Sequence, residues 1–182
     1  MNADDPISAL VIEVGDLLRE KHWTLSTVES CTGGLVGAAL TALPGISEVY
    51  LGGYITYSNM AKQMAVGVSP QTLAKHGAVS SQVAIEMAKG GRRKLLTTHA
   101  LSITGIAGPD GGSDTKPVGT VWICVHRGPQ EIDCRRFIFP GDRSSVRTCA
   151  VVAALTMLIE NITQQSQPLD HQHEHISEPA QA

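Results

Sequence analysis

The sequence is poor in aromatic residues and has no tract of basic residues. Only seven of its 182 residues are aromatic (two Trp, three Tyr and two Phe), whereas proteins that stack nucleic-acid bases depend on aromatic platforms. The net charge of −3 comes from three acids in residues 163–182, so the remaining 162 residues balance 14 acids against 14 bases. A neutral body without a basic tract argues against nucleic acid or an acidic membrane surface as a partner.

The chain also lacks the signs of export and of a membrane anchor. Residues 1–8 do not have the basic-then-apolar pattern of a signal peptide. The longest nearly apolar run, Cys149–Ile159, is shorter than the roughly 20 residues of a membrane-spanning helix. The four cysteines are far apart and form no CxxC pair. We therefore expect reduced thiols, no membrane contact and a cytoplasmic location.

What is present is a regular alternation of helical and strand patterns. Apolar residues make up 42% of the chain, enough to bury a core, and the length is that of about one domain. The patterns predict helices over residues 7–22, 35–43, 58–64, 70–76, 81–96 and 142–162, and strands over 25–28, 49–57, 100–104, 118–126 and 131–139. The last two strands are adjacent, joined at 127–129, which indicates a hairpin. The sequence thus predicts an α/β layered domain over residues 1–162 with a mixed sheet, followed by a polar, His-rich tail over 163–182.

Two segments leave predicted strands at their carboxyl ends, where ligands of such sheets bind. The first, residues 29–34, is a turn from strand into helix that contains Ser30 and Cys31. Either side chain is a candidate nucleophile beside unpaired N–H groups of the helix start, which extend from Thr32 to Leu35 and suit an oxyanion. The alternative is that Ser30 or Thr32 simply caps the helix, and that the two glycines allow close packing.

The second segment is the glycine-rich loop that begins at Thr104 and ends at Pro117. Its glycines permit backbone conformations that point N–H groups at a phosphate, and Lys116 adds a positive charge. The loop has neither the Gly-Lys-Ser/Thr ending of a P-loop nor GxGxxG spacing. The alternative is an ordinary surface loop.

Two further segments carry candidate polar side chains. The strand over 49–57 delivers Tyr57, and the following turn delivers Lys62, which can serve a serine as base if burial lowers its pKa. The alternative is a solvated lysine and a sheet aromatic. Arg143 and Arg147 lie four residues apart at a helix start, where an anion would offset their unfavourable position in the helix dipole. The alternative is a pair of surface arginines.

The histidines show no spacing typical of a metal site, so we expect no metal and no cofactor. His171, His173 and His175 alternate in the tail and are expected to be solvated; the alternative is that they bind a metal weakly.

Six motifs in order resemble one known family. They are SCTGG at 30–34, YSN-x-AK at 57–62, HGAVS at 76–80, TGIAGPDGGS at 104–113, KPVGTV at 116–121 and GDR-x-x-VR at 141–147. Together they resemble the C-terminal domain family of CinA, the competence/damage-inducible protein, over about residues 7–162. The family includes stand-alone nicotinamide-nucleotide amidases. Val28 and Met60 depart from residues frequent in the family, and neither is a proposed nucleophile or base.

The resemblance implies a three-layer α/β/α sandwich with a mixed, mostly parallel sheet carrying an antiparallel hairpin. It implies hydrolysis of nicotinamide mononucleotide (NMN) to nicotinic acid mononucleotide and ammonia, and a homo-oligomer in the free-standing form. By resemblance, Ser30 is the nucleophile, Lys62 its general base, and Tyr57 orients them or relays a proton. The oxyanion and substrate-binding residues implied are Cys31, Thr32, Gly33, Gly34, Thr104, Gly105, Ala107, Gly108, Gly111, Gly112, Lys116, Arg143 and Arg147.

Three other functions stay open at this point. The same loops suit a non-catalytic nucleotide-binding or regulatory module, or an amidase or phosphohydrolase that acts on a related nucleotide. A structural partner in DNA uptake or repair is suggested only by the family's name, and the neutral body gives it no physical support.

Overall fold

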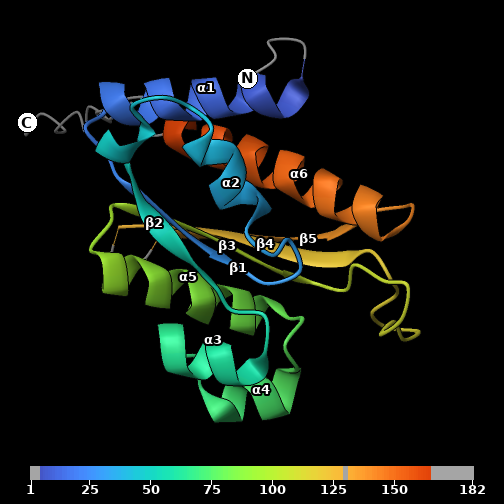
Figure 1. Ribbon diagram of the computed structural model, residues 1–182. Coiled ribbons are helices and arrows are strands. Elements are labelled where there is room, and N and C mark those ends of the chain that lie inside the picture. Colours follow the sequence, from blue (N-terminus) through green and yellow to red (C-terminus); the bar gives the residue numbers. More distant parts are fainter. Residues whose placement is uncertain (1–4, 129–130, 165–182) are drawn as a thin grey trace, which may run out of the picture.

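A computed structural model describes residues 5–128 and 131–164, which form one sheet and the helices that cover it (Figure 1). The strands are β1 (Leu25–Glu29), β2 (Tyr50–Ile55), β3 (His99–Gly105), β4 (Thr120–Arg127) and β5 (Glu131–Ile138). The helices are α1 (Pro6–Glu20), α2 (Leu35–Thr41), the 3-10 turn η1 (Ile46–Glu48), α3 (Asn59–Val66), α4 (Pro70–His76), α5 (Ser81–Leu95) and α6 (Arg143–Gln164). Each predicted element is present, with ends that shift by a few residues.

The sheet is mixed, with strand order β2-β1-β3-β4-β5. The central strand β1 pairs in parallel with β2 and β3, whereas β4 runs antiparallel to both β3 and β5. The predicted hairpin is therefore confirmed as β4–β5. Its predicted turn ends at Pro129, which lies outside the described residues, as do the tail residues 165–182.

Helices cover both faces of the sheet, so the three-layer sandwich is confirmed. Figure 1 shows α1, α2 and α6 on one face and α3, α4 and α5 on the other. The larger cluster of buried apolar side chains lies under α1, α2 and α6, and two smaller clusters lie under α5. By length and composition α6 could cross a membrane, but half of its most apolar stretch is buried inside the protein. It packs against α1 and the sheet, as the core helix of a layered domain does.

Side-chain caps fix where the helices begin. The Ser80 hydroxyl accepts a hydrogen bond from Val83 N, so Ser80 rather than Ser81 caps α5. The Ser58 hydroxyl accepts from Ala61 N at 3.0 Å and starts α3 directly after β2. The predicted cap at Asp142 is confirmed by a 2.8 Å hydrogen bond from Ser145 N to its carboxylate.

The site is positioned by the common direction of the three parallel strands. The carboxyl ends of β1, β2 and β3 lie at one edge of the sheet. Helix α3 follows β2 and packs closely against α5, since a Cβ on Gly90 of α5 would collide with the Val66 carbonyl at the end of α3. The turn after β1 and the helix after β2 therefore meet above the sheet.

Candidate active site

Ser30 is the first residue beyond β1. Its backbone N–H donates to Ile103 O of β3 at 2.9 Å, so the strand's ladder continues to the base of the turn. Its side chain is buried, and the chain turns sharply after it to enter α2 at Leu35. The hydroxyl is thereby held at the carboxyl edge of the sheet, as the sequence predicted.

Lys62, which lies on α3, contacts this hydroxyl. It is 1% exposed. Its ammonium nitrogen Nζ donates to Ser30 Oγ at 3.0 Å and to the Thr56 carbonyl at 2.8 Å. The fold therefore joins a serine and a lysine that are 32 residues apart.

Burial changes the acid–base character of this lysine. Loss of solvent lowers the pKa of Lys62 from 10.5 to about 8, and no carboxylate is among the groups that shift it. With a pKa near 8, about a tenth of the amine is uncharged at pH 7. An uncharged amine in contact with a hydroxyl is able to act as its general base.

Cys31, the other candidate nucleophile, has different surroundings. Burial raises the pKa of the Cys31 thiol to about 11, despite the N–H groups of Cys31 and Thr32, which lower it. The thiol is therefore protonated near neutral pH, and the thiolate is the reactive form. The Lys62 hydrogen bond goes to Ser30 Oγ. The geometry favours Ser30 over Cys31.

Glu29 supports the nucleophile turn from below. Its carboxylate is buried at 2% exposure, and it accepts hydrogen bonds from three amides at the start of α2. Oε2 accepts from Gly34 N at 3.0 Å and Val36 N at 3.2 Å, and Oε1 accepts from Gly37 N at 2.8 Å. Charge-assisted bonds to free helix amides are strong, so strand, turn and helix are tied together. Sequence reasoning missed this role, because Glu29 is the last residue of β1 and lies well before α2 begins at Leu35, outside the usual capping positions.

The Glu29 contact corrects the expected set of oxyanion donors. The Gly34 amide donates to Glu29, and the Gly33 amide donates to Ser30 O at 3.0 Å, so neither points freely into the site. In the part of the chain that the structure describes, the N–H groups of Cys31 and Thr32 have no backbone acceptor. These two amides, rather than those of the glycines, are the candidate oxyanion donors next to Ser30 in sequence.

Tyr57 and Arg143 form the mouth of the site. Arg143 Nη2 donates to the Tyr57 hydroxyl at 3.0 Å, and Arg143 Nη1 donates to Gly108 O at 2.9 Å. Tyr57 is 61% exposed, and no hydrogen bond joins it to Ser30 or Lys62 within the described residues. Its hydroxyl therefore contacts Arg143 and not the buried pair.

Arg147 has a different position from Arg143. Its Nη2 donates to Thr32 O at 2.9 Å, which holds the nucleophile turn from α6. Its Nε is buried without a partner among the described residues. The two arginines were expected to share one role, but only Arg143 lines the cavity.

The cavity beside Ser30 has a volume of about 160 Å³. It is lined by Ser30, Cys31, Tyr57, Lys62, Ala78, Val79, Thr104, Gly105, Ala107 and Arg143. Ala78 and Val79 were not among the expected site residues, although they lie inside the HGAVS motif. Thr104 Oγ1 donates to Ala78 O at 2.9 Å and so fixes this wall against β3.

Other expected site residues lie apart from this cavity. Gly111 and Gly112 do not line it, and Gly108 takes part only through its carbonyl. Lys116 lies in a neighbouring cavity. Among residues 5–128 and 131–164, no three His, Cys, Asp or Glu side chains gather as metal ligands would.

Comparison with known proteins gives one consistent result. The family model described as CinA C-terminal domain matches residues 7–162. The nicotinamide-nucleotide amidohydrolase PncC of Escherichia coli (strain K12) is 45% identical over 161 residues, which cover 88% of this chain and 98% of that protein. A CinA-like protein of Solibacter usitatus is 45% identical over 159 residues, but the match covers only 38% of its length.

The similar solved structures are also competence/damage-inducible or CinA superfamily proteins. The competence/damage-inducible protein CihA from Agrobacterium tumefaciens has a TM-score of 0.85 at 36% identity, covering 90% of this chain and 99% of that one. The CinA superfamily protein KP700603 from Klebsiella pneumoniae has a TM-score of 0.84 at 37% identity, covering 87% and 98%.

Proposed function

The chain belongs to the CinA C-terminal domain family, and we propose that it is a nicotinamide-nucleotide amidase that hydrolyses NMN to nicotinic acid mononucleotide and ammonia. The observation that carries the proposal is the 3.0 Å hydrogen bond from buried Lys62 Nζ to Ser30 Oγ. A serine and a lysine base are sufficient for amide cleavage. The name of the E. coli relative supports the choice of amide.

The reaction follows from the arrangement of the pair. Uncharged Lys62 accepts the hydroxyl proton while Ser30 Oγ attacks the carboxamide carbon. The N–H groups of Cys31 and Thr32 stabilise the oxyanion of the tetrahedral intermediate. Protonated Lys62 then returns the proton to the leaving nitrogen, the C–N bond breaks, and ammonia departs. Water, with Lys62 again as base, hydrolyses the Ser30 ester and frees the acid product.

The mouth residues hold the nucleotide during this sequence. Tyr57 and Arg143 present a hydroxyl and a guanidinium to the cavity, which Gly105 and Ala107 also line. We assign these residues to substrate binding rather than to proton transfer. Arg147 and Glu29 instead position the nucleophile turn, since each bonds to its backbone or to the start of α2.

The direct test is to incubate the purified protein with NMN and to measure ammonia and nicotinic acid mononucleotide. We expect the two products in equal amounts. Binding of NMN without product would support the alternative of a nucleotide-binding module. Hydrolysis of another nucleotide amide, and not of NMN, would show that the substrate assignment is wrong and that the reaction type is right.

A second test separates the two candidate nucleophiles. We expect Cys31→Ala to retain activity within about tenfold of wild type, because the substitution keeps the backbone N–H and the Lys62–Ser30 contact. Iodoacetamide should inhibit the wild-type protein slowly, since the Cys31 thiol is buried and its pKa is raised. Rapid loss of activity with iodoacetamide, prevented by Cys31→Ala, would assign the chemistry to Cys31.

The resemblance also predicts a cytoplasmic homo-oligomer without nucleic-acid or membrane partners. We keep these as part of the proposal.

A further inference from the structure

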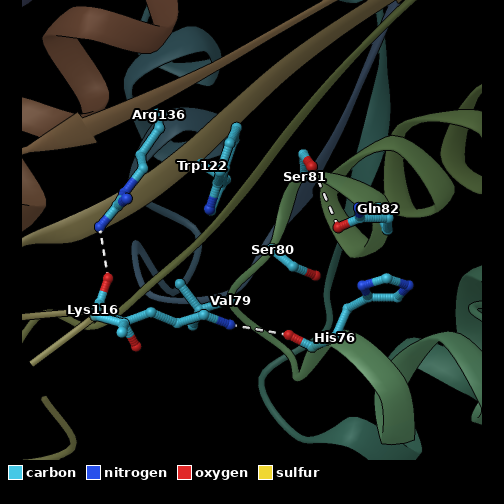
Figure 2. A pocket seen from close by; sticks show the side chains of 9 residues that line it. His76, Val79, Ser80, Ser81, Gln82, Lys116, Trp122 and Arg136 are labelled. Atoms are coloured by element: carbon cyan, nitrogen blue, oxygen red, sulfur yellow. Dashed lines mark hydrogen bonds between the residues drawn. The ribbon is translucent and has the colours of Figure 1, made fainter. Parts of the chain in front are cut away.

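A second cavity, of about 240 Å³, lies next to the proposed active site, and Val79 lines both. It opens between the start of α5 and the paired strands β4 and β5. Figure 2 shows Trp122 and Arg136 on the sheet side, Ser80 and His76 on the helix side, and the Lys116 side chain extending between them.

The sheet register fixes how this cavity relates to the first one. Thr104, which lines the active-site cavity, pairs with Trp122 on β4, and Trp122 pairs with Arg136 on β5. Paired residues of neighbouring strands point to the same face of a sheet. The three side chains therefore form one row across β3, β4 and β5 on the α5 face. With strands about 4.8 Å apart, Arg136 starts about 9.6 Å from Thr104.

The charge of this cavity is positive and has no internal counter-charge. Lys116 Nζ donates to His76 O at 2.9 Å, and Arg136 Nη2 donates to Thr115 O at 2.9 Å. Each cation thus uses one donor on a backbone carbonyl and keeps the others. No carboxylate lines the cavity, and neither side chain has an ion-pair partner in the described part of the chain.

The neighbouring arginine on β5, unlike Arg136, has ion-pair partners among the described residues. Arg135 points to the other face of β5 and makes ion pairs with Asp133 and Glu160, each at 2.6 Å. Along one strand, therefore, one guanidinium is neutralised and the next is left for an external anion.

We propose that the cavity between Lys116 and Arg136 is the subsite for the phosphate of the mononucleotide. The proposal rests on the proposed function, and it assigns the phosphate to these two cations and not to Arg143, which is engaged with Tyr57 and Gly108. With the carboxamide at Ser30, the ring and ribose extend past Val79 and Trp122, and the phosphate meets the two cations. A mononucleotide has this order of groups, with its phosphate and its base at opposite ends of the ribose.

Binding measurements without turnover test the subsite. In a Ser30→Ala background, the dissociation constants of NMN and of nicotinamide riboside, which lacks the phosphate, are measured by calorimetry. We expect Lys116→Ala and Arg136→Ala each to weaken NMN binding about tenfold or more and to change riboside binding less than twofold. Inorganic phosphate should compete with NMN in the parent protein and not in the double variant.

Controls separate the subsite from a general loss of charge or fold. Lys94→Ala removes an exposed lysine at the far end of α5 and should leave both affinities unchanged. Arg136→Lys should recover part of the NMN affinity, which a folding defect would not allow. Equal loss for both ligands, or phosphate-specific loss with Arg143→Ala instead, would overturn the proposal.

The outcome is distinguishable from failure of the proposed function. If the wild-type protein hydrolyses NMN but the two variants bind NMN normally, only the subsite is wrong. If NMN is not hydrolysed, competition by inorganic phosphate with nucleotide binding, lost in the double variant, would still support the subsite. Persistence of that competition in the double variant would refute it.

Discussion

We expect Ser30→Ala to abolish turnover of NMN, with kcat reduced by about 10⁴-fold or more, and to leave the fold intact. The reason is that the hydroxyl supplies the atom that forms the acyl-enzyme, and no neighbouring group replaces it. The protonated Cys31 thiol is not a substitute, since its pKa is raised by burial. Losing one hydroxyl at a site that Lys62 already fills opens little space, so the thermal unfolding midpoint should change by only a few degrees.

The measurement is single-turnover kinetics with mass spectrometry of the protein. Wild-type protein quenched early in turnover should carry an acyl adduct on the peptide that contains Ser30, and Ser30→Ala should carry none. Ser47→Ala is a matched control, because Ser47 is an exposed serine of η1. Activity of Ser30→Ala near that of the Ser47→Ala control would remove Ser30 from the mechanism.

The second large effect is expected for Lys62→Met, which removes the proposed general base. We expect kcat/KM to fall by about 10²–10⁴-fold, the usual contribution of a general base. Methionine keeps most of the buried volume, so the loss reports on the amine rather than on a cavity. Lys62→Arg should not restore activity, because a guanidinium stays protonated and is no base at neutral pH.

The pH profile distinguishes a base from a structural lysine. Wild-type kcat/KM should rise with pH and level off above about pH 8, where Lys62 loses its proton. Lys62→Met should lack this rise. A variant with an unchanged profile and rate would place the base elsewhere.

The lowered pKa of Lys62 also affects how the stability of the protein depends on pH. Its folded-state pKa of about 8 lies below the unfolded value of 10.5, so the unfolded chain binds more protons between these limits. The free energy of unfolding should therefore rise with pH from about 8 to 10.5, and Lys62→Met should lose that dependence. At pH 7 the variant should be more stable than the wild type, because it no longer buries an amine that prefers solvent.

Local patterns in the sequence were sufficient for the elements and for the sheet's mixed character. Helical spacing, serine and aspartate caps, and the two adjacent strands after residue 117 each have local causes, and each was confirmed. The family resemblance also named Ser30 and Lys62 as a pair. No local pattern shows that they touch, because their contact depends on how α3 packs over the end of β1.

Other features of the site could not be predicted from the sequence, because they depend on contacts between distant segments. The amides of Gly33 and Gly34 were expected to face a ligand, but the first donates to Ser30 O and the second to the Glu29 carboxylate. Tyr57 was expected to orient the pair or to relay a proton; it lines the same cavity, and its hydroxyl accepts a hydrogen bond from Arg143, 86 residues further along the chain. Arg136 was not singled out at all, because an alternating strand does not reveal which of its cations lacks a partner.

The hydrogen bonds from the start of α2 to the Glu29 carboxylate make the position of Ser30 depend on the folding of the sheet. Helix α2 has only seven residues, too few to persist alone in water, and three of its first amides are satisfied by a strand residue. In a chain that has not yet folded this far, we expect neither the ordered turn at Ser30 nor the buried position of Lys62. We therefore expect the contact between Ser30 and Lys62 to form only after β1 has joined the sheet.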